Sequence, residues 1–217
     1  GISSSLPVKC LKRLFKNNNL NSKVILDIGA APGGKTAQLL DYGFRTKSID
    51  ISDERINKLK ENLDRLNYNT DLKCIDFLDY NDEEVYDAVL LDAPCTASGL
   101  MQKKPEILLK DKTEDLESLI KKQRKLLEKS CGYVKSGGYI VYCVCSIFSK
   151  EGKGQIESFL KKYKNFSLVT PDKNIQKYGK LLNNNMLLIT PKKNSFAENL
   201  VGTIDGFFIA ILKKEYE

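Results

Sequence analysis

The sequence has 217 residues, of which 41% are hydrophobic, so it is long enough to enclose one sizeable core and predicts a single globular domain. Its 35 Lys and Arg residues exceed its 28 Asp and Glu residues, and the formal charge of +7 permits a polyanionic partner. No run approaches the roughly 18 apolar residues of a membrane span, and the first residues lack a signal-peptide pattern, which excludes a membrane protein and favours a soluble one inside the cell.

Short apolar runs rich in β-forming residues alternate with segments of helical periodicity. The strands are predicted at 24–29, 46–50, 72–76, 86–92, 138–145 and 207–213. Helices are predicted between them, at 34–43, 52–67, 112–134 and 151–163. This alternation predicts an α/β fold with a doubly wound sheet. The stretch 170–204 is interpreted as loops on either side of one strand at 187–190.

The cysteine and histidine content restricts the chemistry. The six cysteines show no paired CxxC spacing and the chain has no His, so we expect neither a disulfide framework nor a metal site. A Ser-His-Asp triad and a Cys-His pair are excluded as well. Acid–base work must therefore fall to carboxylates, Lys, Tyr or thiols.

The turn after the first predicted strand is built from small residues. Small side chains let the backbone approach a ligand closely, and the amide groups at the start of the next helix can meet a carboxylate. A tight connection without a ligand is the alternative interpretation of such a turn. The candidate cofactor-binding residues here are Gly29, Ala30, Ala31, Pro32, Gly33, Gly34 and Lys35.

Four successive strands carry an Asp at or near the carboxyl end: Asp27, Asp50, Asp76 and Asp92. Such a series favours a nucleotide-like ligand, with Asp50 placed to bond a ribose diol and Asp76 to receive an adenine amino group. Arg55 could reach the same ligand from the following helix. Because the turn has neither the NAD pattern GxGxxG nor the ATP pattern GxxxxGK[ST], S-adenosylmethionine fits better.

Two cysteines lie where predicted strands give way to loops. Cys95 follows the fourth strand and Cys145 ends the fifth, so both can face one pocket beside the cofactor, whereas Cys131 and Cys143 are interpreted as buried packing. Two thiols near a methyl donor suit methylation of cytosine carbon 5, which becomes nucleophilic once a thiolate adds to carbon 6.

The remaining roles follow from that chemistry. Asp92 is placed to stabilise the charge that develops near ring nitrogen 3. Cys95 is a candidate to assist removal of the carbon 5 proton. Lys35 is the candidate cation that lowers the pKa of the attacking thiol, because no His is present.

At these residues the sequence resembles the Nol1/Nop2/Sun family of RNA cytosine-5 methyltransferases, particularly the bacterial small-subunit ribosomal RNA enzymes of the Sun or Fmu type. The resemblance covers nearly the whole chain. It rests on the segments DIGAAPGGKT, SIDISDERINKLKENLDRL, LLDAPCTASGLMQKKPEI, SGGYIVYCVCSIFSKEG and DGFFIAILKK, in the family's order.

This resemblance implies a class I methyltransferase fold, a Rossmann-like and mostly parallel sheet with an antiparallel strand near the C-terminus. It implies that Cys145 is the nucleophile and that Cys95 is linked to product release. DNA cytosine methyltransferases attack from a Pro-Cys motif like Pro94-Cys95, so the exchanged roles remain the alternative.

The resemblance also implies further properties of the protein. The expected partner is RNA, most plausibly ribosomal, and the expected state is a monomer in the cytoplasm or in an organelle, without metal or membrane. Full-length relatives carry an additional amino-terminal RNA-binding region, so residues 1–217 are interpreted as a single catalytic domain that binds the cofactor but binds RNA poorly.

Three alternative functions stay open: a transfer RNA substrate, methylation of an amine, and a catalytically impaired ribosome-assembly factor that binds the cofactor. Amine methyltransferases need no thiol and carry another motif after the fourth strand. The impaired factor is suggested by Ser149-Lys150-Glu151-Gly152, which replaces the family's PEEN. Retention of both Cys95 and Cys145 argues against it.

Overall fold

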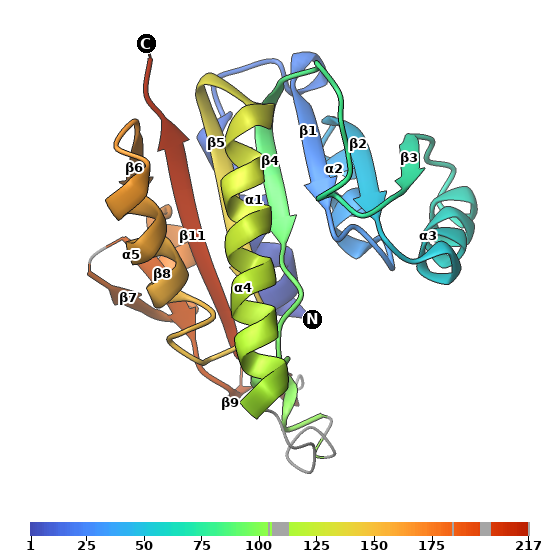
Figure 1. Cartoon of the computed structure of the whole chain (residues 1–217). Coiled ribbons are helices and arrows are strands. Elements are labelled where there is room, and N and C mark those ends of the chain that lie inside the picture. Colours follow the sequence, from blue (N-terminus) through green and yellow to red (C-terminus); the bar gives the residue numbers. More distant parts are fainter. Residues whose placement is uncertain (104, 106–112, 184, 196–200, 217) are drawn as a thin grey trace.

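The predicted strands join in one sheet with helices on both faces (Figure 1). A computed structural model describes residues 1–103, 105, 113–183, 185–195 and 201–216. The strand order of the main sheet is β3-β2-β1-β4-β5-β11-β8-β7, and β6 pairs with the second half of β11. This arrangement confirms the doubly wound α/β fold.

The strands in the parallel part of the sheet have their carboxyl ends at one edge of the molecule. The candidate functional residues lie at this edge. Its strands are β1 (Val24–Ile28), β2 (Arg45–Asp50), β3 (Asp71–Cys74), β4 (Tyr86–Asp92) and β5 (Val134–Val144). The chain passes from β1 to β2 on one side and returns through β4 on the other, so the strand order reverses between β1 and β4. Ligands of open α/β sheets bind beyond the carboxyl ends of the strands at such a point.

The carboxyl-terminal part of the sheet is antiparallel. Its strands are β6 (Phe166–Val169), β7 (Lys180–Leu182), β8 (Met186–Ile189) and β11 (Phe207–Lys214). β11 runs antiparallel to β5 along six residue pairs, from Phe208 opposite Val144 to Lys213 opposite Tyr139. The expected antiparallel strand near the C-terminus is therefore confirmed.

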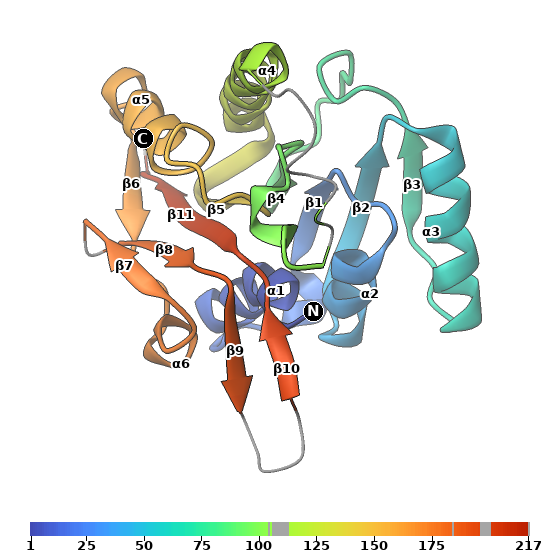
Figure 2. The same ribbon diagram turned by 90° about the horizontal axis from the view of Figure 1, so that it is seen from below.

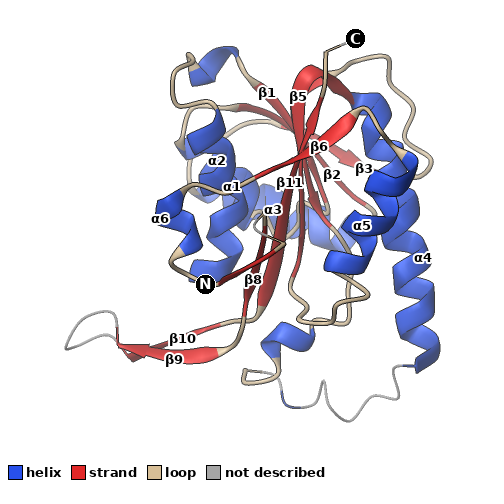
Figure 3. Ribbon diagram, turned by 90° about the vertical axis from the view of Figure 1, so that its left-hand side faces the viewer, coloured by secondary structure: helices blue, strands red, loops and turns tan. Residues whose placement is uncertain are grey.

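Two helical layers cover the sheet (Figure 3). One face carries α1 (Ile2–Leu14), α2 (Gly34–Asp41) and α6 (Lys173–Gln176), and the other carries α4 (Thr113–Ser130) and α5 (Lys153–Lys162). α3 (Asp53–Arg65) packs on the β1–α2 turn through Leu59 and Leu63. No helix in the described part of the chain is long and apolar enough to cross a bilayer.

The stretch 170–204 differs from the predicted loops. Besides β8 it contains α6, β7 and a hairpin of β9 (Lys192–Ser195) and β10 (Val201–Ile204), which projects from the body in Figures 2 and 3. β7 turns into β8 at Asn183, whose φ of 48° is a conformation that Asn tolerates. These strands have three or four residues each, too few for an alternating pattern to be recognised.

Candidate active site

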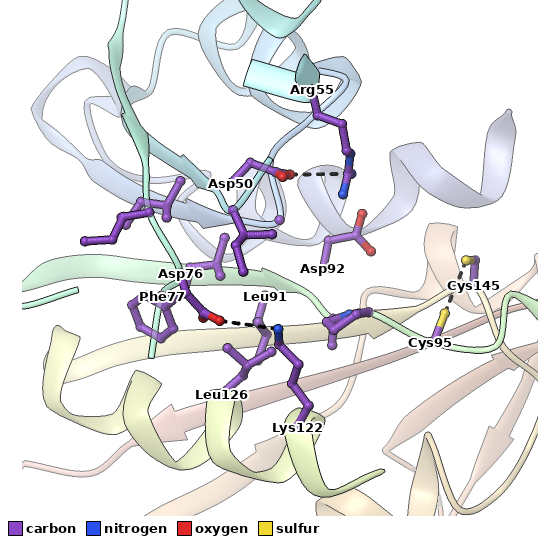
Figure 4. Close-up of a pocket in the computed structure, with 17 residues that line it drawn as sticks. Asp50, Arg55, Asp76, Phe77, Leu91, Asp92, Cys95, Lys122, Leu126 and Cys145 are labelled. Atoms are coloured by element: carbon purple, nitrogen blue, oxygen red, sulfur yellow. Dashed lines mark hydrogen bonds and ion pairs between the residues drawn. The ribbon is translucent and has the colours of Figure 1, made fainter. Parts of the chain in front are cut away.

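A cavity of about 260 Å³ opens at the carboxyl ends of β1, β2 and β4 (Figure 4). Apolar side chains form its centre: Ile28, Ile49, Ile51, Ile75, Phe77, Leu91 and Leu126. Acidic residues stand around this centre, and the two cysteines Cys95 and Cys145 close one end. The combination suits a ligand with a flat apolar body and polar groups at its edges.

The β1–α2 turn lies directly against the end of β4. Gly29 has φ +73°, and a Cβ on it would stand 2.4 Å from the backbone oxygen of Asp92, so this position requires glycine. Gly33, with φ +99°, ends the turn where α2 begins. Gly29 lines the cavity, whereas Ala30 and Ala31 are buried below it in the cluster with Leu59.

Asp50 ends β2 and fixes the turn beside it. Its carboxylate accepts hydrogen bonds from the backbone nitrogens of Ala31 and Ser52, each at 3.1 Å. Arg55, on α3, lies 3.4 Å from the same carboxylate and donates to the backbone oxygen of Ala31. Both side chains line the cavity, so the structure brings these two predicted residues together.

Asp76 stands across the cavity from Asp50 (Figure 4). It lies two residues beyond the end of β3, where Oδ1 accepts from the backbone nitrogen of Leu78 at 2.9 Å. Its Oδ2 lies 3.4 Å from Nζ of Lys122, a residue of α4 that the sequence analysis did not select. Lys122 is one of many lysines on an amphipathic helix, so nothing in the sequence separates it from the solvated ones.

Asp92, at the end of β4, is held by a cation and a thiol. Nζ of Lys35 lies 2.7 Å from Asp92 Oδ2, and Sγ of Cys143 lies 3.7 Å from Oδ1. Burial lowers the pKa of Lys35, but the charge and hydrogen bond of Asp92 outweigh it and raise that pKa above its ordinary value. Lys35 therefore stays cationic. Cys143 is buried as expected, and it also contacts Asp92.

The two cysteine thiols lie side by side, with 3.3 Å between their sulfur atoms. The hydrogen bond from Cys95 lowers the pKa of Cys145 against the opposing effects of burial and of Asp92, and the charge of Lys35 lowers it further. The same hydrogen bond, with burial, raises the pKa of Cys95. The pair is thus arranged so that Cys145 ionises first and Cys95 keeps its proton.

The sequence matches the model of a known protein family. The family model described as "16S rRNA methyltransferase RsmB/F" matches residues 15–213, which is nearly the whole chain. The chain belongs to the RsmB/F family. This confirms the family resemblance that the sequence motifs indicated.

Curated members of the RsmB/F family resemble the chain over much of its length. Ribosomal RNA small subunit methyltransferase B of Photorhabdus laumondii is 36% identical over 160 residues, which cover 71% of this chain and 37% of that protein. The protein of the same name from an Enterobacter species is 32% identical over 202 residues, covering 90% and 43%. The chain therefore spans about two fifths of the length of these relatives.

A solved structure shares the fold. NSun6 from Pyrococcus horikoshii with SFG superposes with a TM-score of 0.77 at 28% identity, covering 98% of this chain and 53% of that one. Nearly the whole chain therefore shares the fold of one half of that protein.

Some residues selected from the sequence lie outside the cavity of this RsmB/F member. Pro32 and Gly34 are exposed on the turn, and Lys35 points to Asp92. Asp27 is fully buried beneath the turn, where it accepts from the Thr36 hydroxyl at 2.7 Å and burial raises its pKa to about 6. Among the described residues, no group of His, Cys, Asp and Glu side chains could hold a metal ion.

Proposed function

We propose that this RsmB/F member transfers a methyl group from S-adenosylmethionine to carbon 5 of a cytosine in small-subunit ribosomal RNA. The observation that carries the proposal is the pair of thiols at one end of the cavity, 3.3 Å apart, with Asp92 beside them. Methylation of an amine needs no thiol, whereas carbon 5 of cytosine reacts after a thiolate adds to the neighbouring carbon. Family membership supports a ribosomal RNA substrate.

The residues around the cavity fit S-adenosylmethionine. Its adenine suits the apolar centre, with Asp76 near the adenine amino group and Asp50 near the ribose hydroxyls. The backbone amides at the start of α2, from Gly34 onward, suit its carboxylate, with Arg55 nearby. When bound, S-adenosylmethionine supplies an electrophilic methyl group.

The cysteine pair would work in sequence. The thiolate of Cys145 forms a bond to carbon 6, and the electron pair of the carbon 5–carbon 6 double bond becomes available at carbon 5 for the methyl group. As ring nitrogen 3 takes up a proton, which neutralises the negative charge developing there, Asp92, held by Lys35, accepts a hydrogen bond from it. Loss of the carbon 5 proton then restores the double bond as the sulfur–carbon bond breaks.

Cys95 fits the releasing role for an electrostatic reason. The hydrogen bond to Cys145 raises the pKa of Cys95 in the resting site. Once Cys145 is bonded to carbon 6 its sulfur carries no charge, so this effect disappears and Cys95 gives up its proton more readily. After the thiol of Cys95 has released its proton to water, the Cys95 thiolate can take the proton from carbon 5.

The direct test is product analysis. The wild-type protein is incubated with isotopically labelled S-adenosylmethionine and small-subunit RNA, and the digested RNA is analysed by mass spectrometry. We expect labelled 5-methylcytidine, and none with Cys145→Ala. Label in transfer RNA instead would change the substrate assignment, whereas binding of both cofactor and small-subunit RNA without any label in the RNA would support the assembly factor.

A further inference from the structure

A buried carboxylate ties together the residues that follow the two thiols. Glu151, between β5 and α5, has 0% relative exposure. Its Oε1 accepts from the backbone nitrogen of Thr96 at 2.9 Å, and its Oε2 accepts from the Thr96 hydroxyl at 2.6 Å. Oε2 also accepts from the Ser146 hydroxyl at 2.5 Å. One side chain thus holds the direct neighbours of Cys95 and Cys145.

Glu151 is itself fixed from two other elements. Nε2 of Gln123, on α4, donates to Oε1 at 3.0 Å and to the backbone oxygen of Pro94 at 2.9 Å. The hydroxyl of Tyr142, on β5, donates to the backbone oxygen of Glu151 at 2.6 Å. A carboxylate can accept about four hydrogen bonds, and the carboxylate of Glu151 accepts four. These bonds fix the position of the Glu151 side chain.

The hydroxyl groups extend the network to the far end of the loop after β4. Ser146 gives its hydrogen to Glu151, so Ser98, at 2.9 Å, donates to Ser146. The backbone nitrogen of Gly99 also donates to the backbone oxygen of Cys145 at 3.0 Å. The hydrogen bond between the backbones of Gly99 and Cys145 joins the two loops independently of Glu151. The Glu151 network fixes the turns beside the sulfur atoms.

Gly152 completes the packing of this loop. A Cβ at this position would stand 2.8 Å from the ring of Phe208, on β11, so the loop lies against the sheet without room for a larger residue. The loop after Cys145 is therefore held by Glu151 and by packing, although the chain has Gly where the resemblance leads us to expect Asn.

From this network we propose that Glu151 is a positioning residue that sets the distance between the thiols of Cys95 and Cys145. It touches neither sulfur and positions both through Thr96 and Ser146, while its charge also raises the pKa of Cys95. The separation of 3.3 Å allows one thiol to stabilise the thiolate of the other. The inference rests on the proposed function for its consequence in methyl transfer, but the thiol separation itself can be measured without RNA.

The test compares the rate at which diamide links the two cysteines in the wild-type protein and in Glu151→Ala. The two thiols become a disulfide as diamide takes up their two electrons and two protons, and mass spectrometry identifies the linked peptides. Asp87→Ala is the matched control. It removes another buried carboxylate, one that pairs with Lys23 at 3.1 Å and Lys135 at 3.0 Å at the opposite edge of the sheet.

We expect Glu151→Ala to slow disulfide formation at least about tenfold and to lower kcat about 100-fold, because misplacement of about 1 Å has effects of that size. KM and the affinity for S-adenosylhomocysteine should stay within about twofold, since Glu151 does not line the cavity. Asp87→Ala should lose stability but keep the disulfide rate. A wild-type disulfide rate in a folded Glu151→Ala protein would overturn the proposal.

A second pair of variants decides the matter if Glu151→Ala does not fold. Thr96→Val removes the hydroxyl donor and should slow disulfide formation, whereas Thr96→Ser keeps the donor and should retain the wild-type rate. Equal rates in these two variants would contradict the proposal. Slow disulfide formation in a protein whose wild-type form methylates no RNA would leave the positioning role standing and the proposed function refuted.

Discussion

At the scale of single residues, the charges around the two thiols favour ionisation of Cys145. Cys95 and Cys145 are both partly buried, Cys95 near the carboxylate of Glu151 and Cys145 near that of Asp92, yet the pKa of Cys145 is lowered and that of Cys95 is raised. The surroundings of the two thiols differ, because the charge of Lys35 favours a thiolate at Cys145 whereas the charge of Glu151 disfavours one at Cys95, and the hydrogen bond between the sulfur atoms then stabilises the Cys145 thiolate. The proposed nucleophile is therefore the cysteine whose thiolate receives the bond.

Removal of the Cys95 thiol should change how the reactivity of Cys145 depends on pH. A thiol reacts as its thiolate, so the alkylation rate rises as pH increases through the pKa. In Cys95→Ala the stabilising hydrogen bond is lost, and we expect the rise to occur at higher pH than in the wild type. Iodoacetamide labelling followed by peptide mass spectrometry measures this, with exposed Cys74 as the internal reference. An unchanged profile would show that the bond does not set the pKa.

Asp27 should make folding stability depend on pH. Burial raises its folded-state pKa from 3.8 to about 6, so between these values the native state binds a proton that the unfolded state does not. The contribution of Asp27 to stability is thus most favourable at low pH and declines as pH rises to about 6. Relative to the wild type, Asp27→Asn should gain up to about 3 kcal/mol of unfolding free energy between pH ~4 and pH ~7. Urea unfolding at both pH values measures the gain, and a constant difference would contradict the assignment.

At the scale of elements, the β1–α2 turn couples the cofactor cavity to the end of β4. Gly29, in the turn, and Gly34, the first residue of α2, offer a matched comparison, because a Cβ on Gly29 would meet Asp92 at 2.4 Å and one on Gly34 would meet nothing within 4 Å. The turn therefore tolerates a side chain at one position and not at the other.

Substitution by alanine should reduce stability strongly at Gly29 and little at Gly34. Gly29→Ala should cost about 2 kcal/mol or more of stability through the close contact and the positive φ, and should weaken S-adenosylhomocysteine binding because Gly29 lines the cavity. Gly34→Ala should stay within about 1 kcal/mol of the wild type. Thermal unfolding and calorimetric titration provide both measurements, and similar losses in the two variants would argue against this account of the turn.

The pattern of elements explains what the sequence could predict. β1, β2, β4 and β11 are apolar runs bounded by polar turns, so their positions were predicted to within about two residues. Adjacent strands then place Cys95 near Cys145, because β4 and β5 are neighbours in a sheet of this type. The position of both cysteines at strand ends was the useful signal.

Other features could not be predicted because they depend on packing between distant segments. α1 has Ser3, Ser4 and Ser5 near its start, contains Pro7 and has no acidic residue in its first turn, so local propensity does not indicate a helix. Its Leu6, Val8 and Leu11 are fully buried, and tertiary packing stabilises it. Lys122 and Glu151 were missed for the same reason, since their partners Asp76 and Thr96 lie more than 40 positions away.

At the scale of the whole molecule, the net charge of +7 has a consequence for RNA binding. Binding that depends on phosphate contacts weakens with salt, because counterions are released when RNA binds. The affinity of this chain for RNA should fall about tenfold or more between about 50 and about 200 mM salt, whereas that for S-adenosylhomocysteine should hardly change. Fluorescence anisotropy and calorimetry test this, and salt-independent RNA binding would contradict it.

The central claim is that Cys145 forms a covalent bond to the target cytosine and that Cys95 releases it. The most direct test incubates Cys95→Ala, Cys145→Ala and the double variant with S-adenosylmethionine and small-subunit RNA, and looks for RNA-linked protein on denaturing gels. We expect an adduct with Cys95→Ala that disappears in the double variant, because the bond to carbon 6 then forms but does not break. An adduct with Cys145→Ala alone would reverse the two roles and contradict the account.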